Sequence, residues 1–190
     1  MNGIRTLALA CAFVAGFAPR SVSAHMTPPV VLATDREAVS RLLGGASRYF
    51  VREVRLSAAQ QDAVRQKTAW TPDADYYRFY VGRSGDGAAV GAVLFLSEFT
   101  IHGPVRVAAA IGPDGKIRGA SVVEVTEESY SWVKPLLDGG FLRRFPGRDA
   151  RGALGATGDV GGSMSRFYAD VIARLIARAA ALYEVASSKT

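Results

Sequence analysis

The middle of the chain alternates between short apolar runs and turn-forming residues. The four runs are rich in β-branched and aromatic residues and cover residues 76–82, 88–97, 105–111 and 116–126. Glycine, proline, aspartate, histidine and serine separate them at residues 84–87, 102–104 and 112–115. Runs of this length with such turns between them are typical of β-hairpins. We therefore expect an antiparallel meander in which residues 90–96, 105–111 and 117–125 are neighbouring strands.

Two short helices are predicted before this meander, each from a capping box. The boxes are Thr34 with Glu37 and Ser57 with Gln60. In such a box the hydroxyl accepts from a helix N–H and the residue three positions later bonds back. Gly44-Gly45 ends the first helix, and the second ends before Trp70. Residues 47–56, between the two helices, are strand-like.

A long amphipathic helix is predicted near the C-terminal end of the chain. Its apolar residues recur at helical spacing and are Met164, Phe167, Val171, Leu175 and Leu182. The helix should begin within about two residues of Ser163 or Met164 and run to about Ala186. From Thr126 to residue 140 the pattern is irregular. The predicted fold class is α+β, a single antiparallel β-sheet flanked by the N-terminal helices and the long C-terminal helix.

The first 24 residues have the composition of a secretory signal peptide. They contain a short basic start, an apolar run over residues 6–18 and small residues up to Ala24. The apolar run is shorter than the roughly 20 residues that a membrane span needs. We expect residues 1–24 to be a signal peptide that packs against nothing, residues 25–34 a flexible leader and residues 35–187 one domain. The protein is then exported, to the periplasm or another extracytoplasmic space.

Charge and cysteine content exclude several classes of function. The formal net charge is +6, but the basic residues are scattered and form no dense run. Export and this scatter argue against a nucleic-acid partner. The only cysteine, Cys11, lies in the predicted signal peptide. The mature chain therefore has neither an intramolecular disulfide nor a thiolate metal site.

Motifs of the common enzyme classes are missing from the sequence. It contains no GxSxG nucleophile elbow, no Walker loop and no HExxH motif. Glu124, Glu127 and Glu128 come close together after a predicted strand. A solvated strand end explains these carboxylates better than an acid/base pair.

The most informative segment is the glycine-rich stretch before the long helix, residues 152–165. The N–H groups and the positive dipole end at a helix start favour a phosphate. Ser163 or Ser165 can donate to a phosphate oxygen at this point. On spacing alone, however, Ser163 is better interpreted as an ordinary N-cap.

Several short stretches occur in an order that has a counterpart in a known family. They are Val90-Gly91-Ala92-Val93-Leu94, Ile111-Gly112-Pro113-Asp114-Gly115-Lys116-Ile117, Val122-Val123-Glu124-Val125, Phe141-Leu142-Arg143-Arg144-Phe145-Pro146-Gly147-Arg148 and Gly155-Ala156-Thr157. Together they resemble the FMN-binding domain of exported bacterial electron-transfer proteins. That family includes the flavin-carrying C subunit of the sodium-pumping NADH:quinone reductase and the G subunit of the Rnf complex. The resemblance extends from about Asp35 to Tyr183.

The resemblance implies an FMN cofactor and an electron carrier rather than a stand-alone catalyst. The family's acceptor threonine, esterified to FMN phosphate by a flavin transferase, corresponds to Thr157 after Gly155 and Ala156. Arg151 and Leu154 stand where the family has Asp and Ser or Thr, so covalent attachment is left open. Implied partners are redox proteins and a flavin transferase. Membrane association, through a partner or an uncleaved signal, is also left open.

A second alignment with the same family places Ser163 at the acceptor position, after Gly161-Gly162. Tyr130 or Trp132 can stack on the isoalloxazine ring, although such aromatic residues more often belong to a core or its rim. Arginines near the flavin would stabilise its anionic reduced forms. The candidates are Arg143, Arg144 and Arg148.

Two other interpretations are kept. In the first, the domain binds no cofactor and acts as an interaction module. In the second, cleavage after Ala24 makes His25 the first residue, and its amine and imidazole chelate copper together with the imidazole of His102.

Overall fold

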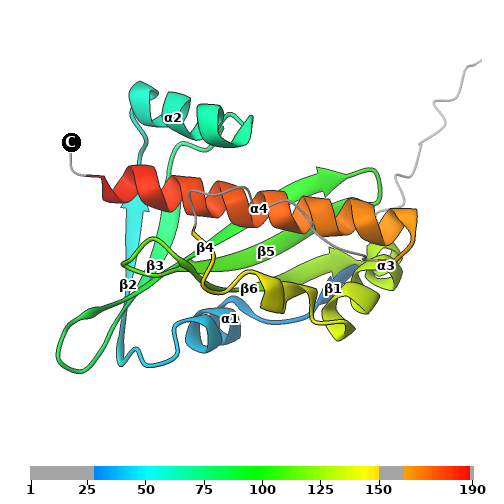
Figure 1. Cartoon of the computed structure of the whole chain (residues 1–190), viewed down its shortest axis with the longest axis horizontal. Helices are drawn as coiled ribbons and strands as arrows, with labels where there is room; N and C mark the ends of the chain where they lie inside the picture. Colours follow the sequence, from blue (N-terminus) through cyan, green and yellow to red (C-terminus); the bar gives the residue numbers. More distant parts are fainter. Residues whose placement is uncertain (1–27, 150–160, 189–190) are drawn as a thin grey trace, which may run out of the picture.

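A computed structural model of the chain describes residues 28–149 and 161–188. These residues form one six-stranded antiparallel sheet in the order β1-β6-β5-β4-β3-β2, with helices on both faces (Figure 1). The strands are β1 (Pro29–Val31), β2 (Arg48–Val54), β3 (Tyr77–Arg83), β4 (Ala89–Thr100), β5 (Gly103–Ile111) and β6 (Ile117–Thr126). The helices are α1 (Asp35–Leu42), α2 (Ala58–Thr68), α3 (Glu127–Asp138), the 3-10 helix η1 (Phe141–Arg144) and α4 (Ser163–Ser187). The predicted α+β class is confirmed.

The three strands predicted to be neighbours are β4, β5 and β6, and this prediction is confirmed. Val93 lies opposite Ala110 across β4 and β5, and Ala109 lies opposite Ala120 across β5 and β6. Gly115 in the β5–β6 turn has a φ of +77°. A side chain disfavours this left-handed conformation, so the turn depends on glycine.

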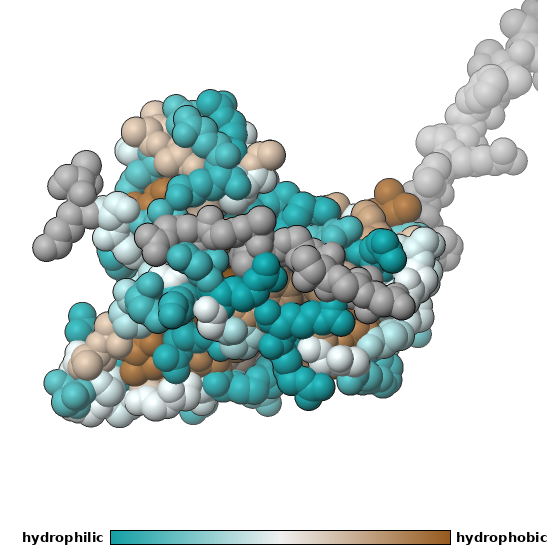
Figure 2. Space-filling model, in the orientation of Figure 1, coloured by the Kyte–Doolittle hydropathy of each residue, from teal (hydrophilic) through white to brown (hydrophobic). Residues whose placement is uncertain are grey.

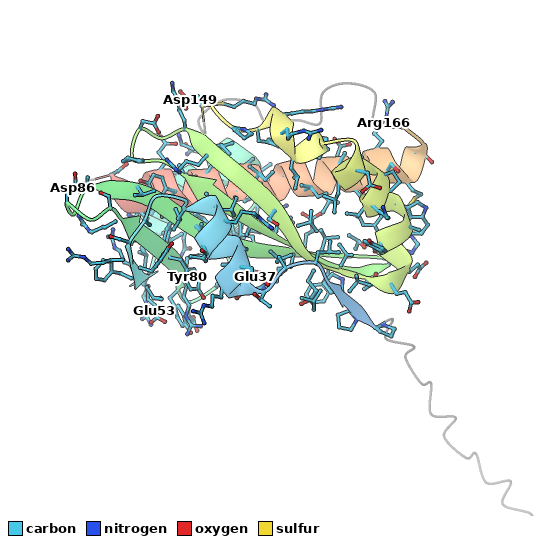
Figure 3. The ribbon with its side chains drawn as sticks, turned by 90° about the horizontal axis from the view of Figure 1, so that it is seen from below. Glu37, Glu53, Tyr80, Asp86, Asp149 and Arg166 are labelled. Atoms are coloured by element: carbon cyan, nitrogen blue, oxygen red, sulfur yellow. The ribbon has the colours of Figure 1, made fainter. Side chains whose placement is uncertain are left out.

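The sheet is covered unequally on its two faces. α4 crosses one face together with α2 and α3, and α1 covers part of the other (Figures 1 and 3). The larger core lies under α4 and includes Leu94, Val107 and Ile176. The smaller core lies under α1 and includes Val93 and Ala108. At the far edge of the sheet, β2 is exposed along its length except at Val54.

A bidentate ion pair fixes the start of α1 to the sheet. Arg106 of β5 donates to the two carboxylate oxygens of Asp35 at 2.6 and 2.8 Å. The hydrogen bond to Asp35 raises the pKa of the Arg106 guanidinium above its ordinary value. The same guanidinium lies 4.7 Å from the ring centre of Phe95, so it also packs on the sheet.

Both predicted capping boxes are present. The Thr34 hydroxyl accepts from the Glu37 N–H at 3.3 Å, and the Glu37 carboxylate accepts from the Thr34 N–H at 2.8 Å. The latter bond lowers the pKa of Glu37. Ser57 and Gln60 repeat the arrangement at the start of α2. These local bonds explain why both helix starts could be predicted from sequence.

The prediction of a flexible leader over residues 25–34 is wrong for its second half. Residues 29–31 form β1, in which Val30 lies opposite Val125 of β6. The prolines before Val30 suggested a mobile segment, but proline is tolerated on an edge strand. The predicted signal peptide, residues 1–24, lies outside the described residues.

The irregular pattern after Thr126 conceals a helix that the sequence analysis missed. Thr126 is the N-cap of α3, and its hydroxyl accepts from the Ser129 N–H at 3.2 Å. The buried face of α3 consists of Ser129, Val133 and Leu136, at helical spacing. Pro135 inside the helix obscured that pattern. The acidic residues assigned to a solvated strand end therefore include the first turn of a helix.

The described surface around α2 is largely hydrophilic on the side seen in Figure 2. No helix within residues 28–149 and 161–188 is long and apolar enough to cross a membrane.

The packing of α4 predicts a large effect of truncating its buried face. Ile176 is fully buried in the main core. We expect Ile176→Ala to lower the free energy of unfolding by about 2–5 kcal/mol, because the lost methyl groups leave a cavity. Urea unfolding followed by circular dichroism measures this change. Ser187→Ala, at the exposed end of the same helix, should change it by no more than about 0.5 kcal/mol; equal losses would contradict the packing.

Candidate functional site at the start of the last helix

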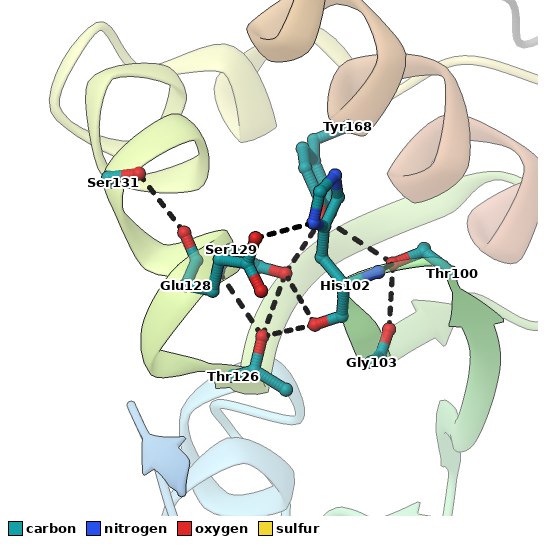
Figure 4. Close-up of polar contacts among 8 residues, drawn as sticks. All are labelled: Thr100, His102, Gly103, Thr126, Glu128, Ser129, Ser131 and Tyr168. Atoms are coloured by element: carbon teal, nitrogen blue, oxygen red, sulfur yellow. Dashed lines mark hydrogen bonds and ion pairs between the residues drawn. The ribbon is translucent and has the colours of Figure 1, made fainter. Parts of the chain in front are cut away.

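Three parts of the chain meet where α4 begins: the β4–β5 turn, the first turns of α3 and the first turns of α4 (Figure 4). The predicted helix start is confirmed, since α4 begins at Ser163. Its N-cap is Gly162, with φ −60° and ψ 169°, so the N-cap residue has no side chain that could cap this end. The interpretation of Ser163 as an ordinary N-cap is therefore wrong. Ser163 is the first helical residue and is exposed.

The first turn of α4 carries no carboxylate. The first turns of α1 and α3 do, with Asp35 and Glu37 in α1 and Glu127 and Glu128 in α3. A carboxylate in a first turn compensates the positive end of the helix dipole. α4 offers the exposed hydroxyl of Ser163 instead, whereas the Ser165 hydroxyl already has a partner on α3. This helix end therefore suits an anion supplied from outside the helix.

A network of hydroxyl groups holds the β4–β5 turn, α3 and α4 together (Figure 4). Ser129 Oγ lies 2.7 Å from Tyr168 Oη and 2.9 Å from Thr126 Oγ1. Thr126 Oγ1 also donates to the His102 carbonyl at 2.6 Å. Tyr168 Oη lies 3.4 Å from Thr100 Oγ1, which donates to the Gly103 carbonyl at 2.8 Å. Since Ser129 and Tyr168 are fully buried, these bonds compensate for the loss of water.

Gly103 allows the turn to approach this network closely. Its φ is +95°, and a Cβ atom on it would lie 2.4 Å from Thr126 Cγ2. Both the backbone conformation and the space therefore require glycine here.

His102 faces α3 from the same turn. Its Nδ1 lies 2.7 Å from Glu128 Oε1, and its ring centre is 4.8 Å from that of Trp132. The Ser129 hydroxyl contacts the carbonyl of His102 and not its ring. The His102–Glu128 pair thus orients an imidazole without activating that serine as a nucleophile.

His25, which was predicted to chelate copper together with His102, lies outside the described residues. Within the described part of the chain, no three His, Cys, Asp or Glu side chains are grouped so that they could hold a metal ion.

Aromatic rings line the junction of α3 and α4. Trp132 and Tyr168 are stacked, with ring centres 5.9 Å apart and planes 12° apart. Ser165 Oγ donates to the Trp132 carbonyl at 3.1 Å and links the two helices. Phe167, expected on the buried face of the helix, is 38% exposed and packs edge-on against Tyr168. The first turns of α4 therefore present an exposed aromatic ring.

Tyr130 lies elsewhere on α3. A hydrogen bond to Asp138 and, in smaller part, the proximity of Tyr130 raise the pKa of Lys134. Tyr130 is thus a neighbour of Lys134, and positions two apart on a helix do not share a face. Tyr130 and Trp132 therefore point to different sides of α3.

The predicted site residues fall into three groups. The structure brings Ser163, Ser165 and Trp132 together at the start of α4. It places Tyr130 apart from them. Gly155, Ala156 and Thr157 lie outside the described residues. Of the arginines expected near a flavin, Arg143 packs against Gly140 and Arg144 lies over the ring of Phe141, both within η1.

Sequence reasoning missed the residues that hold the site in place. They are Thr100, Thr126, Ser129 and Tyr168. One signal was available: Thr126 followed by two glutamates is a typical helix start. No signal in the sequence indicated the contact between Ser129 and Tyr168, which is 39 positions later.

Comparison with protein-family models, curated proteins and solved structures finds no match to this chain.

The hydroxyl network predicts an energetic coupling between Ser129 and Tyr168. Removal of either hydroxyl leaves its buried partner with fewer hydrogen bonds, so Ser129→Ala and Tyr168→Phe should each lower the free energy of unfolding by about 1–3 kcal/mol. The double variant should lose less than the sum of the two, because each single variant already removes the one contact that the two hydroxyls share. Urea unfolding of the four proteins measures the coupling.

Ser131→Ala is the matched control, since this serine is exposed on the same helix and donates to the carbonyl of Glu128, one turn before it. Its effect should stay within about 0.5 kcal/mol. Strictly additive losses for Ser129 and Tyr168 would show that their contact contributes no coupling.

Proposed function

We propose that the protein is an exported flavoprotein that binds FMN and carries electrons between redox partners. The observation that supports this most is the start of α4, where two glycines precede a first turn with hydroxyls and no carboxylate. The phosphate of FMN is an anion of the kind that such a helix end binds. The resemblance of the strands and turns to the FMN-binding family supports the choice of this nucleotide over other phosphates.

The phosphate would lie against Ser163. This residue is exposed at the first helical position, where N–H groups point outward from the helix. Arg166, also exposed, follows three positions later and is therefore a neighbour on the helix surface. A hydroxyl, backbone N–H groups and a guanidinium are suitable donors for a phosphate dianion.

The isoalloxazine ring would pack on Phe167. Phe167 is four positions after Ser163, so the two side chains lie on one side of the helix. Its partial exposure leaves an apolar surface one turn from the phosphate position. The ring of Trp132 already contacts the rings of both Tyr168 and His102. The flavin could therefore reach the edge of the Trp132 ring but could not stack on its face. We therefore assign the stacking role to Phe167 rather than to Trp132 or Tyr130.

Electron transfer needs no acid/base pair from the protein, because the flavin carries the chemistry. The protein has to hold the phosphate, pack the ring and admit a partner. Phe99 and Ile101, at the β4–β5 turn, are 83% and 91% exposed. Two large apolar side chains exposed at one turn are suited to a contact with another protein. A redox partner that docks on this turn would approach the start of α4.

The same two side chains favour a second candidate, a cofactor-free interaction module. It would use Phe99 and Ile101 to bind a partner without carrying electrons. A flavin measurement separates the two functions.

The proposal predicts that the full chain binds FMN and that the affinity depends on Ser163. We expect Ser163→Ala to weaken FMN binding about 10- to 100-fold, the effect of losing one hydrogen bond to a charged group. Phe167→Ala should weaken it about 2- to 10-fold, through the lost ring contact. Titration of FMN with its fluorescence as the signal measures both. Ser131→Ala, on α3, is the control and should bind FMN as the wild type does.

Covalent attachment is tested separately, by exporting the chain in cells with and without a flavin transferase. Flavin that stays with the denatured protein and disappears in Thr157→Ala or in Ser163→Ala identifies the ester. If the protein gains no flavin in these cells and does not bind added FMN, the flavoprotein proposal is wrong.

A further inference from the structure

We infer that β2 is an association edge through which two copies of this chain pair, antiparallel and centred on Val51, into one continuous sheet. This inference does not depend on the cofactor. β2 is the edge strand farthest from β1 and β6, and it contributes no residue to the proposed site at the start of α4 (Figure 1).

The two edges of the sheet are built differently. β1 has three residues, begins with proline and is preceded by a second proline, so few backbone groups can accept another strand. β2 has seven residues, contains no proline and pairs with β3 without a register shift. Every residue of β2 except Val54 is exposed. An edge of this length and regularity is a template for a further strand.

Large apolar residues lie on both faces of this edge. Tyr49, Phe50 and Val51 follow one another along β2, and Val51 is 57% exposed. Successive residues of a strand point to opposite faces, so Phe50 lies on the α2 side and the other two on the α1 side. Pairing with a second strand would cover apolar surface on both faces of the sheet.

The charged residues of β2 favour a second copy of this chain as the strand that pairs with this edge. In such a dimer a twofold axis perpendicular to the sheet relates the two β2 strands, and it keeps each face of the sheet on its own side. Opposed residues must then point to the same face, so the axis has to pass between one residue and the same residue of the second copy. With the axis at Phe50, Arg48 of one copy lies opposite Arg52 of the other. With the axis at Arg52 or at Glu53, that residue lies opposite its own copy. Like charges directly opposite destabilise a strand pair.

A centre at Val51 avoids each of these repulsions and uses the whole strand. The pairs are Val51 with Val51, Phe50 with Arg52, Tyr49 with Glu53 and Arg48 with Val54. Phe50 opposite Arg52 places a guanidinium beside an aromatic ring, which is favourable. A centre at Tyr49 pairs only three residues. The seven-residue strand is thus complementary to itself in one register.

The α1 face of the sheet, which α1 covers only in part, continues the same row of residues. Within the sheet, Val51 lies opposite Tyr80, whose ring is 5.4 Å from that of Phe95. The Val51 of a second copy would extend this apolar row across the axis and meet an identical row. Association therefore joins two partly covered sheet faces as well as two edges.

Sedimentation velocity of the full chain over a range of concentrations tests the pairing. The wild type should form a dimer, and Val51→Lys should raise its dissociation constant at least about tenfold, because two like charges meet on the axis. Val31→Lys, on the opposite edge strand and 61% exposed, is the matched control and should dimerise like the wild type. A wild type that stays monomeric, or a dimer that Val31→Lys weakens as much as Val51→Lys, overturns the inference.

A cross-link gives a readout that does not depend on how Val51→Lys folds. In a Cys11→Ser background, Val51→Cys should form a disulfide with its own copy, since opposed residues of antiparallel strands have Cα atoms about 4.5–5.5 Å apart. Val31→Cys should not. Absence of the Val51→Cys cross-link under oxidising conditions contradicts the register, and a monomer that binds only foreign extended peptides contradicts self-pairing.

Discussion

The burial of one face of α4 against the sheet is the interaction on which the rest of the structure depends. Small side chains such as Ala169, Ala173 and Ala180 bring this helix close to β4 and β5, while Ile172 and Ile176 fill the core. α2 then docks on α4, where Lys67 and Glu184 form a 2.9 Å ion pair. Because the helix is 25 residues long, this packing also fixes where its first turn lies relative to the sheet.

Polar contacts at two levels of α4 determine its position along the sheet. Glu98 of β4 accepts from Arg174 at 2.8 Å and from Arg178 at 2.7 Å. Nearer the helix start, Tyr168 joins the buried hydroxyls of Ser129 and Thr100. Buried polar groups have few acceptable partners, so such networks specify one arrangement where apolar packing alone permits small shifts. The helix start, and any ligand it holds, is therefore rigid relative to the β4–β5 turn.

Local signals explain which parts of the fold could be predicted from sequence. Both capping boxes, the strands β4 to β6 and the start of α4 depend on residues within a few positions of one another. α3 was missed because Pro135 interrupts its pattern, and β1 because its prolines suggested a leader. The site itself needed long-range information: Trp132 and Ser165 were singled out individually, but the ring of Tyr168 that stacks on Trp132 comes from a helix face expected to be core.

The two proposed surfaces of the protein are compatible because one lies at the β2 edge of the sheet and the other at the turn that joins the central strands β4 and β5. Pairing through β2 leaves the β4–β5 turn and the start of α4 open in both copies. From β5 of one copy to β5 of the other there are seven strand spacings of about 4.8 Å, or about 34 Å across the joined sheet. The two helix starts would then bind their ligands independently. Each copy would also keep its own exposed Phe99 and Ile101 for a partner, so dimerisation would double the docking sites without changing either of them.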